Sequence, residues 1–209
     1  MDIQFFGANC VRIANKKATL VFDDNLSELG AKSVTKSGDV ALFTGVHEPV
    51  SAEVRLSIDF PGEYEVADIS VRGVQARAHI DEEGKRTAVM YRLMMDDIRV
   101  AVVGHVHPDL TEAQLELLGV IDVLIIPVGG NGYTLDSIGA LKLIKKIEPK
   151  IVIPTHYDDK DLKFEVPQQA LTDALTGLSM EVSETVERLK LKSTDIDETT
   201  KLIVVERSK

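Results

Sequence analysis

Five histidines are the residues of this 209-residue chain best suited to chemistry, and each of them follows a predicted β-strand. His47, His79, His105 and His156 stand at or just beyond the ends of four such strands, and His107 comes two residues after His105. Histidine is the commonest metal ligand and exchanges protons near neutral pH. Buried strands that end in polar residues are where α/β folds place their sites. Together the five indicate a metal or acid–base site, although each alone is more typical of a surface or capping position.

The elements that would position these histidines change in type along the chain. The first half is typical of an antiparallel meander of short strands separated by polar turns. The second half alternates helices with apolar strands that are buried on both faces. Strands are predicted at residues 3–6, 10–13, 18–22, 40–43, 56–59, 69–78, 88–94, 98–103, 123–126, 151–153, 186–191 and 202–205, with one more after a turn at 60–62. Helices are predicted at residues 111–118, with Thr111 as N-cap, 134–147 and 168–175.

Composition and charge exclude several classes of function. The formal net charge of −10 disfavours binding to nucleic acid or to anionic lipid. No apolar run approaches the roughly 20 residues of a membrane span, and residues 1–4 lack the basic and apolar regions of a signal peptide. The lone Cys10 excludes an intrachain disulfide. We expect a cytoplasmic protein of one domain, residues 1–209, without nucleic-acid or membrane partners.

Three segments of the chain resemble the metallo-β-lactamase fold superfamily, and above all its small bacterial Zn-dependent hydrolases. They are Gly62-Glu63-Tyr64-Glu65-Val66, the run IDVLIIPVGG at residues 121–130 and the run PKIVIPTHY at residues 149–157. Residues 3–10 resemble the first hairpin of these proteins, so that the resemblance covers most of the chain. It implies an α+β fold, an αββα four-layer sandwich in which two mixed β-sheets pack face to face with helices on the outer faces.

The resemblance also implies where a metal site would lie. Members of the superfamily hold two metal ions with a His-x-His-x-Asp-His motif, a further His, an Asp and a final His. In this chain the motif corresponds to Gly45, His47, Pro49 and Val50, so three of its four ligands are replaced. The side chains of Pro49 and Val50 cannot bind a metal ion.

The later ligand positions are better preserved. His79 and His156 match the two later histidines of the superfamily, whereas His105 stands where its bridging Asp would be. Two divalent cations held close together need anionic ligands to offset their repulsion, and both carboxylates are absent here. We therefore expect no binuclear site. His47, His79, His105 and His156 are predicted to surround one cavity, where neutral imidazoles could bind a single Zn²⁺, Ni²⁺ or Cu²⁺ ion.

Three functions follow as hypotheses. The first is a catalytically weak or inactive member of the superfamily that binds a small molecule or a protein, with no cofactor. The second is a working hydrolase of a phosphoester or lactone that uses a rewired mononuclear histidine site, with one divalent metal such as zinc. The third is an oligomerisation or scaffold module, which would form a homo-oligomer. The metal content of the purified protein separates the first two.

Overall fold

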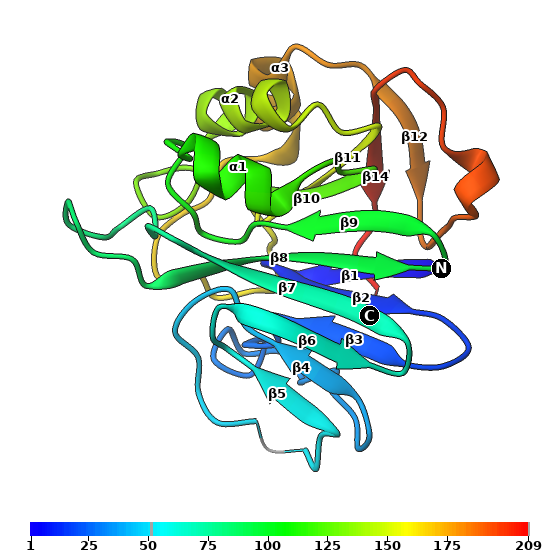
Figure 1. Cartoon of the computed structure of the whole chain (residues 1–209). Helices are drawn as coiled ribbons and strands as arrows, with labels where there is room; N and C mark the ends of the chain where they lie inside the picture. The colour runs from blue at the N-terminus through cyan, green and yellow to red at the C-terminus, as the bar shows by residue number, and fades with distance from the viewer. Residues whose placement is uncertain (51, 209) are drawn as a thin grey trace.

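The computed structural model describes residues 1–50 and 52–208. In this part of the chain two mixed β-sheets pack face to face, and three α-helices lie over the outer face of the larger sheet (Figure 1). The predicted sandwich of two mixed sheets is confirmed. Among the described residues, however, no α-helix covers the outer face of the smaller sheet, where loops take that place.

The smaller sheet has six strands in the order β13-β1-β2-β3-β4-β5. Strands β1, β2 and β3 follow one another in the chain, are joined by tight turns and pair in antiparallel fashion, as the sequence predicts. Strand β4 then pairs in parallel with β3, and β5 pairs in parallel with β4. The bounds of its strands are β1 Asp2–Gly7, β2 Cys10–Ala14, β3 Thr19–Phe22, β4 Val40–Leu42, β5 Leu56–Ile58 and β13 Leu189–Lys190.

The larger sheet has eight strands in the order β12-β14-β11-β10-β9-β8-β7-β6. Strands β6 to β9 form an antiparallel meander, and β9, β10, β11, β14 and β12 run parallel to one another. The bounds of its strands are β6 Gly62–Val66, β7 Ile69–Ala76, β8 Ala88–Met95, β9 Ile98–Val102, β10 Val123–Pro127, β11 Ile151–Thr155, β12 Val182–Val186 and β14 Lys201–Val205.

The helices are α1 Glu112–Leu118, α2 Ser137–Ile147 and α3 Leu171–Leu178, with a short 3-10 turn at Ser193–Asp195. Thr111 caps α1 as predicted, because its hydroxyl accepts the Gln114 N–H and the Gln114 side chain bonds back in a capping box. The predicted start of the second helix is wrong by three residues, since the carboxylate of Asp136 caps α2. The third helix begins at Leu171 rather than at residue 168.

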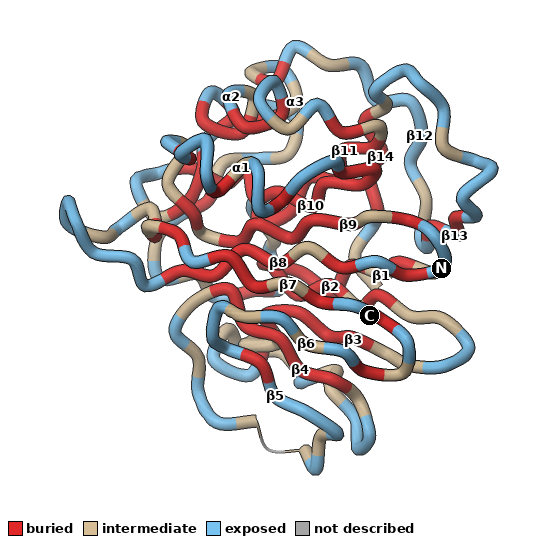
Figure 2. The backbone as a smooth tube through the Cα atoms, in the orientation of Figure 1, coloured by how far each residue is buried: buried red, intermediate tan, exposed pale blue. Residues whose placement is uncertain are grey.

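Three apolar clusters hold these layers together, and Figure 2 shows the buried strands at the centre of the molecule. The largest fills the space between the two sheets and includes Phe22, Tyr91 and Ile125. A second lies between the larger sheet and the helices. The third covers the outer face of the smaller sheet, where Leu26 and Leu162 reach it from loops. None of the helices in the described residues combines the length and the apolar character that a membrane crossing needs.

Candidate functional site

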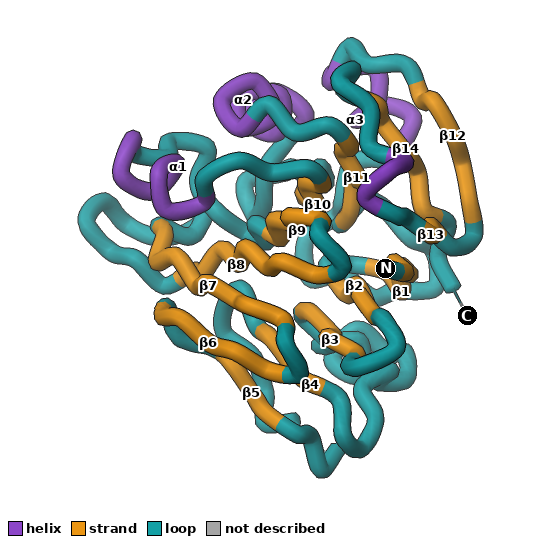
Figure 3. The backbone as a smooth tube through the Cα atoms, turned by 45° about the vertical axis from the view of Figure 1, so that its right-hand side comes forward, coloured by secondary structure: helices purple, strands orange, loops and turns teal. Residues whose placement is uncertain are grey.

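Three central strands bring the candidate residues to one edge of the larger sheet. Strands β9, β10 and β11 lie side by side in the larger sheet (Figure 3). They pair in parallel, so their carboxyl ends meet at the same edge. His105 follows β9, the Gly129-Gly130 turn follows β10, and His156 follows β11. This edge is where open α/β sheets place their ligands.

His105 lies at the centre of a group of aromatic side chains. Its ring centroid is 4.6 Å from that of His156 and 4.9 Å from that of Tyr133, and both contacts are edge-to-face. The preceding Gly104 has φ +56°, and a Cβ there would lie 2.0 Å from Oγ1 of Thr44. Only glycine fits this approach, which brings the end of β9 against the loop that follows β4.

His156 is buried and held in a strained backbone conformation. Its φ is +52°, a left-handed conformation that costs a non-glycine residue roughly 1–3 kcal/mol. Its backbone N–H donates to the Ala8 carbonyl at 2.7 Å, and its ring Nδ1 lies 3.0 Å from Oε1 of the buried Gln168. These two bonds fix the imidazole against the turn between β1 and β2.

The histidines at this edge are neutral at physiological pH. Burial lowers the pKa of His156 to about 4. Burial, reinforced by the neighbouring His156 and His79, holds the pKa of His105 well below its usual range. Burial and the nearby His107 also lower the pKa of His79. Neutral imidazoles keep a nitrogen lone pair, which can accept a hydrogen bond or bind a cation.

His79 joins this group through the backbone, because its N–H donates to the His105 carbonyl at 2.7 Å. The Nδ1 atoms of His79 and His105 are both buried, and neither has a hydrogen-bond partner within residues 1–50 and 52–208. Such orphaned buried nitrogens are uncommon, and each calls for an explanation. The structure thus brings the rings of His105 and His156 into contact, joins His79 to them through the backbone, and leaves Nδ1 of His79 and Nδ1 of His105 unpartnered in the described residues.

His47 does not join this group. Its ring stacks on Phe43, with ring centroids 3.5 Å apart. Its Nε2 lies 3.4 Å from a carboxylate oxygen of Asp59, the residue that follows β5. Its Nδ1 lies 2.8 Å from the Glu48 carbonyl oxygen. The expectation that all four histidines surround one cavity is therefore not met in the structure, since stacking on Phe43 turns the His47 ring away.

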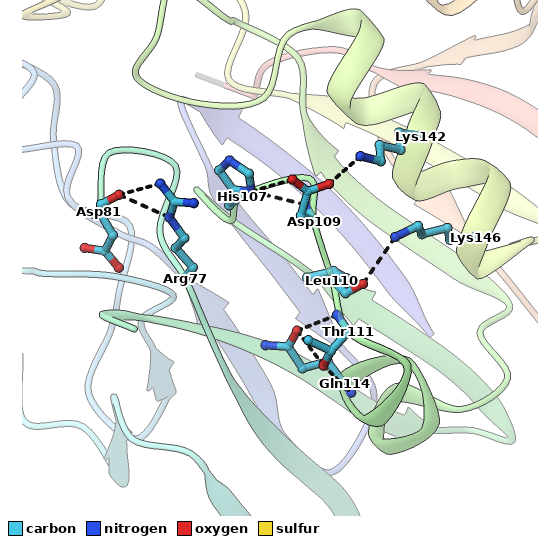
Figure 4. A network of polar contacts seen from close by, with 9 residues as sticks. All are labelled: Arg77, Asp81, His107, Asp109, Leu110, Thr111, Gln114, Lys142 and Lys146. Carbon is cyan, nitrogen blue, oxygen red and sulfur yellow. Dashed lines mark hydrogen bonds and ion pairs between the residues drawn. The ribbon is translucent and has the colours of Figure 1, made fainter. Parts of the chain in front are cut away.

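The fifth histidine, His107, belongs to a polar network beside α2 (Figure 4). Its Nδ1 accepts the Asp109 backbone N–H at 3.2 Å, and the Asp109 carboxylate pairs in turn with Lys142. Arg77 in the same view donates to the backbone carbonyl of Asp81 at 2.8 and 3.1 Å. His107 thus serves the docking of α2, although its ring is 6.0 Å from that of His79.

A cavity of about 120 Å³ opens beside His105. Its polar lining includes Asp23, Thr44 and Tyr133, and the exposed side chains of Val46 and Ile80 form an apolar rim. Asp23 is buried and accepts from the Thr44 backbone N–H at 2.7 Å and from its hydroxyl at 2.6 Å. Burial raises the pKa of Asp23 to about 6, although the two bonds from Thr44 oppose this effect.

Within the described residues, no three His, Cys, Asp or Glu side chains are arranged so that they could hold a metal ion. Binding of a metal by the predicted histidines therefore stays a prediction. Sequence reasoning gave no role to Asp23, Tyr133 or Gln168. Asp23 carries a signal in the sequence, because it directly follows a buried strand, but Gln168 falls in the helix predicted at residues 168–175 and no motif marks it.

Two sequence comparisons relate the chain to known proteins. A family described as a beta-lactamase superfamily domain matches residues 2–156. A UPF0173 metal-dependent hydrolase of Thermoplasma acidophilum is 41% identical over 51 residues, which is 23% of this chain and 22% of that protein. The matched segment thus spans about a fifth of this curated relative.

Solved structures extend the similarity over the whole chain. A provisionally assigned Zn-dependent hydrolase of the metallo-β-lactamase superfamily from Thermotoga maritima is 27% identical, with a TM-score of 0.80 and 99% of each chain covered. Igni18, a metallo hydrolase of Ignicoccus hospitalis, is 15% identical with a TM-score of 0.63, covering 99% of this chain and 94% of the other. The second likeness concerns the fold alone.

Proposed function

The chain belongs to the beta-lactamase superfamily domain family, and we propose that it is a catalytically weak or inactive member that binds a small molecule or a protein. The predicted family and its metallo-β-lactamase fold are confirmed. The family implies a divalent metal and hydrolysis, and the relatives are described as metal-dependent hydrolases. Weak or absent catalysis is our inference from the residues of this chain.

The orientation of His47 is the observation that carries the proposal. It stands in the loop after β4 and contacts Phe43 and Asp59 instead of the cavity. Pro49 and Val50, in the same loop, have side chains without a ligand atom. In the described residues the donors that follow β9 and β11 are imidazoles, and the nearby carboxylate of Asp23 already accepts two hydrogen bonds from Thr44, so it is not available to offset the charge of two cations. The residues present therefore do not fit a metal pair.

The cavity beside His105 sets the size of a ligand. Its volume of about 120 Å³ is below the roughly 300–1,000 Å³ of pockets that enclose drug-sized molecules. It suits a group of a few non-hydrogen atoms, either a small molecule or the end of a larger one. Thr44, His105 and Tyr133 offer polar contacts, and the apolar rim favours a ligand with a hydrophobic part.

The orphaned nitrogens favour a second candidate function. Nδ1 of His79 and Nδ1 of His105 are buried without partners in the described part of the chain. Lone pairs in such positions suit Zn²⁺ or another imidazole-binding ion. A hydrolase with one metal ion in a rewired histidine site remains the alternative, which would act on a phosphoester or lactone.

Zinc titration followed by calorimetry tests these proposals. The purified protein, without a histidine tag, is compared with a variant that carries Gly45→His, Pro49→Asp, Val50→His and His105→Asp. We expect the wild-type protein to bind no pair of ions. The variant should bind two, and should gain about 2.7 kcal/mol of stability per bound ion at a free zinc concentration one hundred times the Kd of that site.

Each outcome decides between the candidates. Binding of two ions by the wild-type protein, or turnover of phosphodiester or β-lactam substrates above roughly 1 s⁻¹ with zinc, would overturn the proposal. Binding of one ion that is lost in His105→Gln would support the mononuclear alternative. A variant that folds but binds no metal would show that the cavity has closed. Pro49→Asp also frees a backbone N–H, so the loop can relax in the variant.

A further inference from the structure

Gln168 bridges the His156 imidazole and the loop that precedes α3. The residue is buried, and its amide Nε2 donates to the Val166 carbonyl at 2.6 Å. Its Oε1 lies 3.0 Å from Nδ1 of His156. A backbone carbonyl can only accept a hydrogen bond, so the amide nitrogen must face Val166 and the amide oxygen must face the imidazole.

The orientation of the amide determines where the His156 proton lies. An amide oxygen can only accept, so Nδ1 of His156 must be the donor in this pair. In a neutral imidazole the second nitrogen then carries the lone pair. The bond to Gln168 is made by Nδ1, so Nε2 is the nitrogen that keeps the lone pair. We propose that Gln168 is a positioning residue that holds the His156 imidazole in the tautomer protonated at Nδ1 and leaves the Nε2 lone pair free for a ligand.

The packing around Gln168 allows it little freedom to turn. A Cβ on Gly129 would lie 2.2 Å from Oε1 of Gln168 and 2.0 Å from the His156 carbonyl oxygen, so the amide fits closely against the end of β10. The neighbouring Gln169 donates its backbone N–H to the Gly129 carbonyl at 2.8 Å and accepts from Asp158 at 2.9 Å. The loop is therefore held by two backbone hydrogen bonds directly after Gln168, which makes this side chain a fixed acceptor.

The lone pair on Nε2 of His156 limits which ligands can bind at this edge of the sheet. A fixed lone pair accepts a hydrogen bond or binds a cation, but it cannot donate to an anion. His156 therefore selects for a donor group or a cation, a statement that rests on the proposed function. The assignment of the tautomer itself does not depend on whether the protein binds anything.

Nitrogen NMR of the histidine rings tests the tautomer directly. Two-bond ¹H–¹⁵N correlation spectra at neutral pH distinguish a protonated ring nitrogen from one with a lone pair by its chemical shift. Burial holds the pKa of His156 at about 4, so the ring is neutral in this experiment. The His156 signals are identified by their loss in His156→Asn, a residue that tolerates positive φ.

Three further variants separate positioning from packing. Gln168→Leu removes the acceptor and should shift His156 toward the tautomer protonated at Nε2, which histidine favours in water. Gln168→Glu keeps an acceptor and should retain the Nδ1 proton. Gln169→Leu changes the adjacent side chain and should leave the tautomer unchanged. Circular dichroism confirms that each variant is folded.

The wild-type spectrum alone can overturn the proposal, even if a variant fails to fold. A lone-pair signal at Nδ1 of His156 in the wild-type protein would contradict it. Retention of the Nδ1 proton in folded Gln168→Leu would also contradict it, because the amide would then not determine the tautomer. A purely structural role for Gln168 would lower the melting temperature of Gln168→Leu without changing the nitrogen shifts of the folded protein.

Discussion

Replacement of Asp23 by Asn should remove a pH dependence from the stability of the protein. Asp23 is buried, and burial raises its pKa from 3.8 to about 6 in the folded state. Between these values the native state binds more protons at this position than the unfolded state, so stability falls as the pH rises through this window. Below it the carboxyl is protonated in both states, and above it both are ionised.

The size of this effect follows from the two pKa values. They differ by about 2, and each pH unit corresponds to about 1.4 kcal/mol, so the ionised carboxylate destabilises the fold by about 3 kcal/mol near pH 7. Asn has nearly the same shape. Its carbonyl can accept from the Thr44 N–H, and its NH₂ can donate to the Thr44 hydroxyl, which now accepts.

Urea unfolding of the wild-type protein and of Asp23→Asn between about pH 4 and about pH 8 measures the difference in free energy. We expect the stability of the wild-type protein relative to the variant to fall by about 2 to 3 kcal/mol over this range. Asp97→Asn, on an exposed turn, controls for the loss of one carboxylate. A difference between wild type and Asp23→Asn that stays constant with pH would refute the argument, because Asp23 would then titrate alike in both states.

Two other substitutions, one of them with a matched control, test the hydrogen bonding and packing around the site. Tyr91→Phe removes the hydroxyl that contacts the Phe43 carbonyl at 3.0 Å and the Ile58 carbonyl at 3.1 Å, and we expect a loss of about 1–3 kcal/mol in urea unfolding. Unchanged stability would mean that water replaces the hydroxyl. Gly129→Ala places a methyl group 2.0 Å from the His156 carbonyl oxygen and should cost about 3 kcal/mol or more, whereas Gly45→Ala, with open space around it, should cost little. Equal thermal melting of the two alanine variants would contradict the close fit at Gly129.

The strand ends could be predicted from the sequence because they depend on local patterns. Apolar runs, interrupted only by Arg99 in the first, indicate β9, β10 and β11, and parallel pairing then places His105 and His156 at one edge without further information. The direction of a side chain within a loop depends instead on distant contacts. The orientation of the His47 ring depends on its contacts with Phe43 and Asp59, and nothing in the spacing of the histidines predicts that orientation.

Errors in the predicted elements have similar causes. Residues 186–191 were predicted to form one strand, but β12 ends at Val186 in one sheet and β13 begins at Leu189 in the other. An apolar pattern indicates burial without saying in which sheet the residue is buried. The third helix begins late because Gln168 contacts His156 and Val166 instead of starting a helical turn.

The ring nitrogens of His79, His105 and His156 differ in their hydrogen bonding, and this difference is relevant to whether the site binds a ligand. His156 has one ring nitrogen bonded within the chain, because Gln168 accepts from its Nδ1. His79 and His105 each keep a buried Nδ1 without a partner in the described residues. An unsatisfied buried polar group costs about 1–3 kcal/mol, and an apolar side chain of similar size would avoid that cost. A cavity that served packing alone would favour such a replacement. The two orphaned nitrogens therefore support the proposal that this edge of the sheet binds a ligand, although the carboxylates for a metal pair are replaced.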